Sequence, residues 1–153
     1  MSDIVVKKLN SGDEIPYGLL MLADPSTESI DDYIHRGDCY AAYIDNIIVG
    51  AYVIIKTRPL TIELVNIAVS EIYQSKGIGK KLILDAIDKA KKENAKIIEV
   101  GTGNSSIIQI TLYQKCGFRI DGIDKDYFKQ HYKDKIIENG IECIDMIRLR
   151  KYL

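Results

Sequence analysis

Short apolar runs rich in β-branched residues recur along the chain and alternate with polar turns. Runs of this kind occupy residues 4–9, 39–44, 47–55 and 61–69, and each predicts a β-strand. The pair Asp45-Asn46 is a two-residue hairpin turn signal between the second and third runs. Residues 64–69 are nearly all apolar, which is typical of a central strand that is buried on both faces.

Other segments carry their apolar residues at helical spacing. Pro16 suits the first turn of a helix, and Ser26 can cap a second helix that ends at Gly37. A longer amphipathic helix begins near residue 78, and residues 107–116 predict a further helix with a glycine just beyond its end. The apolar face of the long helix consists of Ile78, Leu82, Ile83, Ala86, Ile87 and Ala90.

The remaining segments complete a mixed α/β sheet with helices on both faces. Residues 97–100, 118–120 and 141–149 predict strands, residues 101–106 predict a loop, and residues 124–135 give no clear prediction. The order is one strand, two helices, three strands, a helix, a strand, a helix and two strands. The strand–helix–strand unit in the middle predicts a right-handed crossover.

The composition is that of one globular domain over residues 1–153. The 153 residues are 46% hydrophobic and 28% charged, and a net charge of −1 leaves no surplus for binding nucleic acid or an anionic membrane. The apolar runs are far shorter than the roughly 20 residues that span a bilayer, and residues 1–8 do not resemble a secretory signal. The 3 cysteines form no CxxC pair and the 2 histidines are isolated, which predicts a reducing cytoplasm and no metal site.

Residues 74–80, Gln-Ser-Lys-Gly-Ile-Gly-Lys, precede the long helix and predict a pyrophosphate site. A helix N-terminus leaves backbone N–H groups unpaired and carries a partial positive charge. Gly77 and Gly79 let phosphate oxygens approach those groups, and Lys76 and Lys80 add positive charge. A glycine-containing turn capped by solvated lysines is the alternative interpretation of these residues taken alone.

Two familiar phosphate motifs do not fit this segment. No Ser or Thr follows a Gly-Lys pair in a GxxxxGK pattern, so the segment is not a Walker loop. Leu82 stands where a dinucleotide fingerprint, GxGxxG, requires its third glycine. Glu99 does lie where a ribose-binding acid would be sought, which keeps a nucleotide-binding fold as a minor alternative.

Two motifs in the correct order resemble the GCN5-related N-acetyltransferase (GNAT) family. Asn66-Ile67-Ala68-Val69, followed by Gln74-x-x-Gly77-x-Gly79 and an amphipathic helix, is similar to the family's motif A. Asn104 and the later Leu112-Tyr113-Gln114-Lys115-Cys116-Gly117-Phe118 resemble its N…LYxKxGF motif. The resemblance implies a mostly antiparallel sheet with a splayed centre. It also implies transfer of acetyl from acetyl-CoA to a primary amine by direct attack in a ternary complex.

The same resemblance implies how acetyl-CoA, the co-substrate, would be held. Pantetheine would lie in the gap between the splayed strands, along the backbone of Ile67, Ala68 and Val69. Asn104 matches the family's asparagine near the pantetheine arm, but Ser106 holds the position seven residues before the tyrosine where that asparagine usually stands, so both remain candidates. The pyrophosphate would be bound by Gln74, Ser75, Lys76, Gly77, Ile78, Gly79 and Lys80.

Three catalytic roles, with four candidate residues, also follow from the resemblance. Glu99 lies in Ile-Glu-Val, which resembles the LEV segment of the ribosomal-protein alanine acetyltransferases, and is the preferred general base; Glu63 is the alternative. The backbone N–H of Val69 would stabilise the oxyanion, and Tyr113 would protonate the CoA thiolate. Simple strand alternation places Ile67 on the same face as Glu63.

The acceptor is the least defined part of this prediction. An acidic cluster in the early helices could attract a cationic polyamine, an aminoglycoside or a peptide N-terminus, although a solvated face is the simpler interpretation. Asp126-Tyr127-Phe128 resembles the position of Asn-Tyr-Tyr in the alanine acetyltransferases, which keeps a protein N-terminus among the candidate acceptors. A non-catalytic acetyl-CoA-binding module is the alternative function, and a monomer or homodimer is expected. The acidic cluster consists of Asp24, Glu28, Asp31 and Asp32.

Overall fold

Nine strands and five α-helices make up the computed structural model, which describes residues 3–153. Residues 1 and 2, part of the single domain predicted over residues 1–153, lie outside the described residues. The strands are β1 (Val5–Lys8), β2 (Asp38–Ile44), β3 (Ile47–Arg58), β4 (Thr61–Val69), β5 (Ile97–Gly103), β6 (Arg119–Asp124), β7 (Ile137–Glu138), β8 (Ile141–Glu142) and β9 (Met146–Tyr152). The helices are α1 (Tyr17–Leu20), α2 (Thr27–Arg36), α3 (Ile78–Lys92), α4 (Ile107–Lys115) and α5 (Tyr127–His131), with a 3₁₀ turn η1 (Glu71–Tyr73) before α3.

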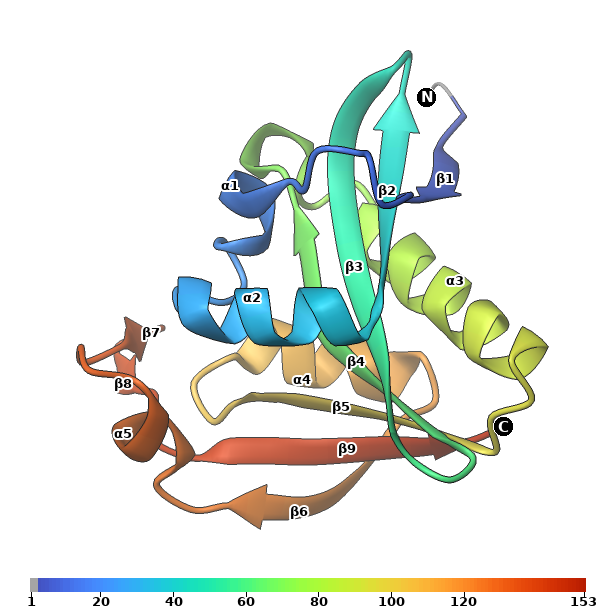
Figure 1. The fold of residues 1–153 in the computed structure, drawn as a ribbon. Helices are drawn as coiled ribbons and strands as arrows, with labels where there is room; N and C mark the ends of the chain where they lie inside the picture. The colour runs from blue at the N-terminus through green and yellow to red at the C-terminus, as the bar shows by residue number, and fades with distance from the viewer. Residues whose placement is uncertain (1–2) are drawn as a thin grey trace.

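Seven of the strands form one sheet in the order β1-β2-β3-β4-β5-β9-β6, and β7 and β8 form a separate hairpin (Figure 1). Within the sheet only β4 and β5 run parallel, and the other neighbours are antiparallel. The predicted mixed and mostly antiparallel sheet is therefore confirmed.

Three local sequence signals, a hairpin turn, a helix cap and a glycine at a helix end, form the structures that they predict. Asp45 and Asn46 both adopt positive φ, 49° and 65°, as a tight hairpin turn between twisted strands requires. The Ser26 hydroxyl accepts a hydrogen bond from the Ser29 backbone N–H at 3.2 Å and caps α2. Gly117 has a φ of 97° just after α4, a conformation that glycine adopts with little strain.

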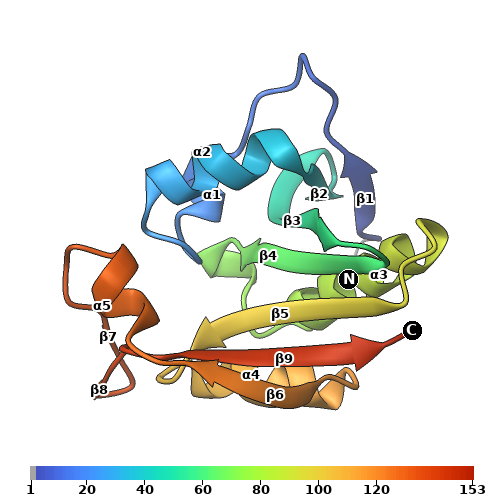
Figure 2. The same cartoon turned by 60° about the horizontal axis from the view of Figure 1, so that its bottom comes forward.

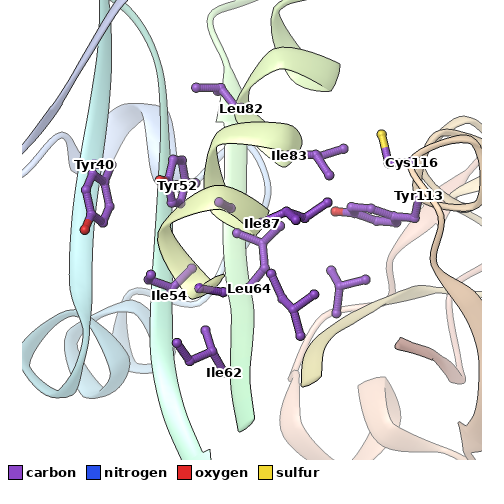
Figure 3. Packing of buried hydrophobic residues seen from close by; sticks show 14 of the residues in the cluster. Tyr40, Tyr52, Ile54, Ile62, Leu64, Leu82, Ile83, Ile87, Tyr113 and Cys116 are labelled. Atoms are coloured by element: carbon purple, nitrogen blue, oxygen red, sulfur yellow. The ribbon is translucent and has the colours of Figure 1, made fainter. Parts of the chain in front are cut away.

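Helices cover both faces of the sheet and create two hydrophobic cores. Ile30 of α2 packs in a core with Val53 of β3, whereas Leu82 of α3 packs in the other core with Tyr52. Successive side chains of a strand point to opposite faces, so these two cores lie on opposite sides of β3. Figure 3 shows the second core, in which side chains of α3 and α4 meet over β4.

The sheet separates between its two parallel strands. Residues 61–64 of β4 pair with residues 97–100 of β5, and the pairing ends there. Beyond that point β4 continues to pair with β3 up to Val69, and β5 continues to pair with β9 up to Gly103. Figure 2 shows the two strands moving apart toward their carboxyl ends. The predicted splayed centre is thus present, and the backbone of residues 65–69 has no strand partner on its β5 side.

A β-bulge in β4 overturns the simple alternation expected along that strand. Val53 pairs with Asn66, but the next residue of β3 pairs with Leu64, so one extra residue of β4 lies between them. After the bulge the side chains exchange faces: Asn66 bonds to groups of α1 and α2, and Ile67 packs against the core under α3. The prediction that Ile67 shares a face with Glu63 is therefore wrong.

Two boundaries in the second half of the chain also differ from prediction. The predicted loop over residues 101–106 begins later, because residues 101–103 pair with β9 and extend β5. The predicted strand over residues 141–149 is divided into β8 and β9. The backbone N–H groups of Ile144 and Asp145, between the two strands, bond to the Asn104 side chain instead of to a strand.

Candidate active site

The loop before α3 has the shape of an anion-binding site. Gly77 occupies the N-cap position with a φ of 83°, and no side chain caps the helix there. Ser75 has a φ of 61°, so the loop turns sharply just before the helix. No heavy atom lies within 4 Å of the position that a Cβ on Gly77 would take. The first N–H groups of a 15-residue helix are therefore accessible to a negatively charged group.

The side chains of this loop divide between structural and electrostatic roles. The Gln74 amide donates a hydrogen bond to the Val69 carbonyl at 2.9 Å, which ties the loop to the end of β4. The Lys76 ammonium lies 5.6 Å from the centre of the Tyr73 ring. Lys80 is exposed on the first turn of α3 and supplies positive charge there.

The loop before α3 lies beside the carboxyl end of β4. A Cβ on Gly79 would lie 3.7 Å from Leu112 of α4 and 4.0 Å from the Val69 side chain. The start of α3, the end of β4 and α4 therefore meet at one place. Ile67 and Val69 pack partly against the core on this side, and Ala68 is buried. The fold thus brings the predicted pantetheine and pyrophosphate residues together.

Tyr113 extends from α4 into the core and is 4% exposed. Its ring packs edge-on against Phe118 at 5.8 Å between centres. Figure 3 shows its hydroxyl directed away from α4 toward Ile87 and Leu64. Burial raises the pKa of the phenol, and the neighbouring Cys116 thiol raises it further, so the hydroxyl keeps its proton at neutral pH. Within residues 3–153 no hydrogen-bond partner of this hydroxyl is found.

The two candidate bases lie side by side but have different partners. Glu63 and Glu99 are register partners on β4 and β5. One oxygen of Glu99 accepts hydrogen bonds from Arg58 at 2.7 Å and from Arg150 at 2.9 Å, so that carboxylate is engaged by two guanidinium groups. Glu63 has a longer ion pair, 3.7 Å, with Arg148. Burial raises the pKa of Glu63, and Arg148 opposes that shift.

Asn104 and Ser106 both contact the segment that leads into β9. The Asn104 amide oxygen accepts hydrogen bonds from the N–H groups of Ile144 and Asp145 at 2.8 and 3.0 Å, and its nitrogen donates to the Glu142 carbonyl at 3.1 Å. The hydroxyl of Ser106 donates to Glu138 at 3.2 Å. These bonds use one of the two N–H groups of the Asn104 amide, so the second N–H remains available as a donor.

A buried polar network beside the gap was not foreseen from the sequence. The Asp24 carboxylate accepts hydrogen bonds from the hydroxyls of Tyr33 and Tyr132 at 3.0 and 2.8 Å. The Asn66 amide donates to the Tyr33 hydroxyl at 2.8 Å and to the Leu20 carbonyl at 3.0 Å. The signal in the sequence was Asn66, a single polar residue within the apolar run of β4. Asp24 is thus a bonded, buried group and not part of an open acidic surface.

Of the other acids of the predicted cluster, Glu28 is exposed and the remaining two have partners. Asp31 accepts a hydrogen bond from the Tyr17 hydroxyl at 2.6 Å, and Asp32 pairs with Arg36 at 2.8 Å. Within residues 3–153, no three His, Cys, Asp or Glu side chains come together as a metal site, and no helix is long and apolar enough to cross a membrane.

The separation of the parallel strands β4 and β5 beside the open N-terminus of α3 indicates the class of this protein. Residues 13–118 match the model of the acetyltransferase (GNAT) family, and the chain belongs to that family of acyltransferases. Over 139 residues it is 59% identical to the uncharacterized N-acetyltransferase YvbK of Bacillus subtilis strain 168, covering 91% of this chain and 89% of that protein.

Solved structures of similar proteins confirm the GNAT fold. A GNAT family acetyltransferase from Elizabethkingia anophelis, crystallised with acetyl-CoA bound, is 49% identical, with a TM-score of 0.97 and 98% of each chain covered. The ribosomal-protein-S18-alanine N-acetyltransferase of Escherichia coli is 20% identical, with a TM-score of 0.78 over 98% of this chain and 94% of that one. At that identity the likeness concerns the fold alone.

Proposed function

We propose that this protein transfers the acetyl group of acetyl-CoA to a primary amine by direct attack in a ternary complex. The observation that carries the proposal is the end of β4–β5 pairing at residues 64 and 100, beside the open N-terminus of α3. This arrangement offers unpaired strand backbone to an extended arm and helix N–H groups to a pyrophosphate at the same end of the sheet. The acetyl-CoA held by a relative 49% identical supports acetyl-CoA as the co-substrate.

In this proposal each part of the cofactor meets a different element. The pantetheine arm lies along Ile67, Ala68 and Val69 at the free edge of β4 and bonds to the backbone of Ile67, which faces the gap. The pyrophosphate accepts hydrogen bonds from backbone N–H groups between Ser75 and Lys80. Gln74 holds that loop against β4, and Asn104 and Ser106 hold the loop after β5.

We assign the general base to Glu63 in place of Glu99. An alkylamine is protonated at neutral pH, since its pKa is about 10, and must lose a proton before it attacks. Two hydrogen-bonded guanidinium groups engage Glu99, whereas Glu63 has one ion pair at 3.7 Å. The raised pKa of Glu63 also brings this carboxyl closer to the value at which a base works best near neutral pH.

The chemical step follows from these positions. The free amine attacks the thioester carbonyl carbon, and the Val69 N–H donates a hydrogen bond to the oxyanion that forms. The carbon–sulfur bond then breaks, and the Tyr113 hydroxyl gives its proton to the departing thiolate. Its burial supports this role, because a raised pKa keeps the phenol protonated until the sulfur becomes negative. Between the protonated amine and the amide product, the acceptor nitrogen loses two protons. One replaces the proton that Tyr113 gives to the thiolate, and the other reaches solvent.

Thiol release from acetyl-CoA, measured with a panel of amines, tests the proposed function. The panel contains a polyamine, an aminoglycoside and a peptide with a free N-terminus. We expect release with at least one member above the rate of hydrolysis without amine. Tight acetyl-CoA binding without amine-dependent release would instead indicate a non-catalytic acetyl-CoA-binding module.

A further inference from the structure

Arg148 contacts a residue two strands away from its own. It lies on β9, where it pairs in register with Gly101 of β5, and β5 separates β9 from β4. Its guanidinium nevertheless forms an ion pair with Glu63 of β4 at 3.7 Å. The side chain therefore crosses over β5 to reach the candidate base.

Gly101 leaves the space for this crossing. A Cβ at this position would lie 2.5 Å from the Met146 sulfur and 3.4 Å from a terminal nitrogen of Arg148. Two side chains of β9 thus lie directly over the Gly101 backbone. A branched side chain at residue 101 would occupy the volume through which the Arg148 guanidinium passes.

Two further contacts hold the guanidinium on its outer side. Its second terminal nitrogen bonds to Asp124, at the end of β6, at 3.3 Å. The Tyr127 ring of α5 lies 5.7 Å from the guanidinium carbon, in the range of a cation–π contact. With both contacts in place, Arg148 presents one nitrogen to Glu63 and cannot close on it as a bidentate pair.

We infer that Arg148 is the positioning residue of the acetyl transfer: anchored by Asp124 and Tyr127 and passing over Gly101, it orients Glu63 and keeps it ionised. The inference rests on the proposed function, in which Glu63 is the base. A long, single ion pair suits that role. It stabilises the carboxylate electrostatically but leaves its oxygens available to the amine, unlike the two short bonds that engage Glu99.

Charged or titratable groups from five elements interact electrostatically with Glu63. Burial of Glu63 raises its pKa, Arg148 is the largest opposing influence, and Glu99 of β5 raises the pKa further. Arg58 of β3 and Arg36 of α2 lower it, and the Tyr127 phenol of α5 also interacts with Glu63. Loss of Arg148 must therefore raise the pKa of Glu63, so that more of this carboxyl is protonated and inactive as a base at neutral pH.

The pH dependence of kcat/KM for the amine tests this inference with Arg148→Met. The titration of the amine itself is common to all variants and cancels in the ratio of variant to wild type. We expect that ratio to fall as the pH is lowered, by up to about tenfold, and to rise toward 1 at high pH, since loss of an opposite charge within ~4–6 Å raises the pKa of a carboxyl by about one unit or more. Arg119→Met, which removes a β6 arginine without an ion pair in residues 3–153, is expected to leave the ratio flat. A flat ratio well below 1 for Arg148→Met would overturn the inference.

A double-mutant cycle separates the crossing path from general damage to the sheet. Gly101→Val is expected to reproduce the pH-dependent ratio of Arg148→Met, and combining the two is expected to add no further pH dependence. An added pH-dependent loss in the combined variant would show that Gly101 does not act through Arg148.

Direct titration of Glu63 keeps the test independent of activity. In protein with ¹³C-labelled glutamate carboxyls, the signal missing from Glu63→Gln identifies this residue. Its midpoint is expected to move to higher pH in Arg148→Met, and an unchanged midpoint would refute the inference. Absence of acetyl transfer by the wild type would refute the proposed function instead, and a Glu63→Gln variant with full activity would refute the assignment of the base.

Discussion

At the residue scale the proposed chemistry depends on single hydroxyl and carboxylate groups, and Tyr113 gives the simplest test. Tyr113→Phe keeps the ring that packs against Phe118 and removes the group that would protonate the thiolate. Because that group acts mainly as the intermediate collapses, we expect kcat to fall about 10- to 100-fold with the KM for acetyl-CoA nearly unchanged. Steady-state kinetics decide the matter, and turnover within about twofold of wild type would make Tyr113 a packing residue.

The two register-paired glutamates are expected to respond differently to the same substitution. Glu63→Gln should lower kcat/KM about 100-fold at neutral pH, as loss of a positioned base typically does, with a smaller deficit at high pH where free amine is abundant. Glu99→Gln should mainly destabilise the fold, by roughly 1–3 kcal/mol, because Arg58 loses its charged partner and Arg150 keeps only its ion pair with Asp121. Kinetics and thermal melting of both variants separate the roles. The reverse pattern would return the base to Glu99.

At the element scale, the start of α3 is the proposed binding site of the cofactor pyrophosphate. Gly77→Glu would place a carboxylate where the pyrophosphate is proposed to bind, and we expect CoA binding to be lost in calorimetry. Gly77→Ala is the matched control, because it imposes the same strain at a φ of 83° without the charge. We expect the alanine variant to retain CoA binding within a few-fold. Unchanged affinity in Gly77→Glu would mean that the pyrophosphate binds elsewhere.

At the scale of the whole molecule, one hydrogen bond joins segments more than a hundred positions apart. The Tyr132 hydroxyl, just after α5, donates to the buried Asp24 carboxylate, which also accepts from Tyr33. Tyr132→Phe should therefore lower the free energy of unfolding by about 1–3 kcal/mol, and amide exchange should rise over residues 124–136. The surface pair of Tyr17 and Asp31 is the control, and Tyr17→Phe should change stability little. Equal effects of the two changes would show that Tyr132 does not hold α5 in place.

The sequence by itself determined the features that depend on neighbouring residues. The cap at Ser26, the turn at Asp45-Asn46 and the end of α4 at Gly117 form as expected, because each needs only a local bond or a permitted φ. The resemblance to the GNAT family likewise predicted the splayed strands and the loop before α3, because it rests on two short continuous motifs.

The tertiary structure alone decided which charges and hydroxyls meet. The bulge in β4 reverses the faces of the strand, and only its pairing with β3 reveals it. Arg148 and Arg150 are two positions apart on β9, which places them on one face, but sequence spacing could not show that one engages Glu99 and the other reaches Glu63. Side-chain ion pairs depend on which strands lie together and where a residue such as Gly101 leaves room. Those are properties of contacts between distant segments.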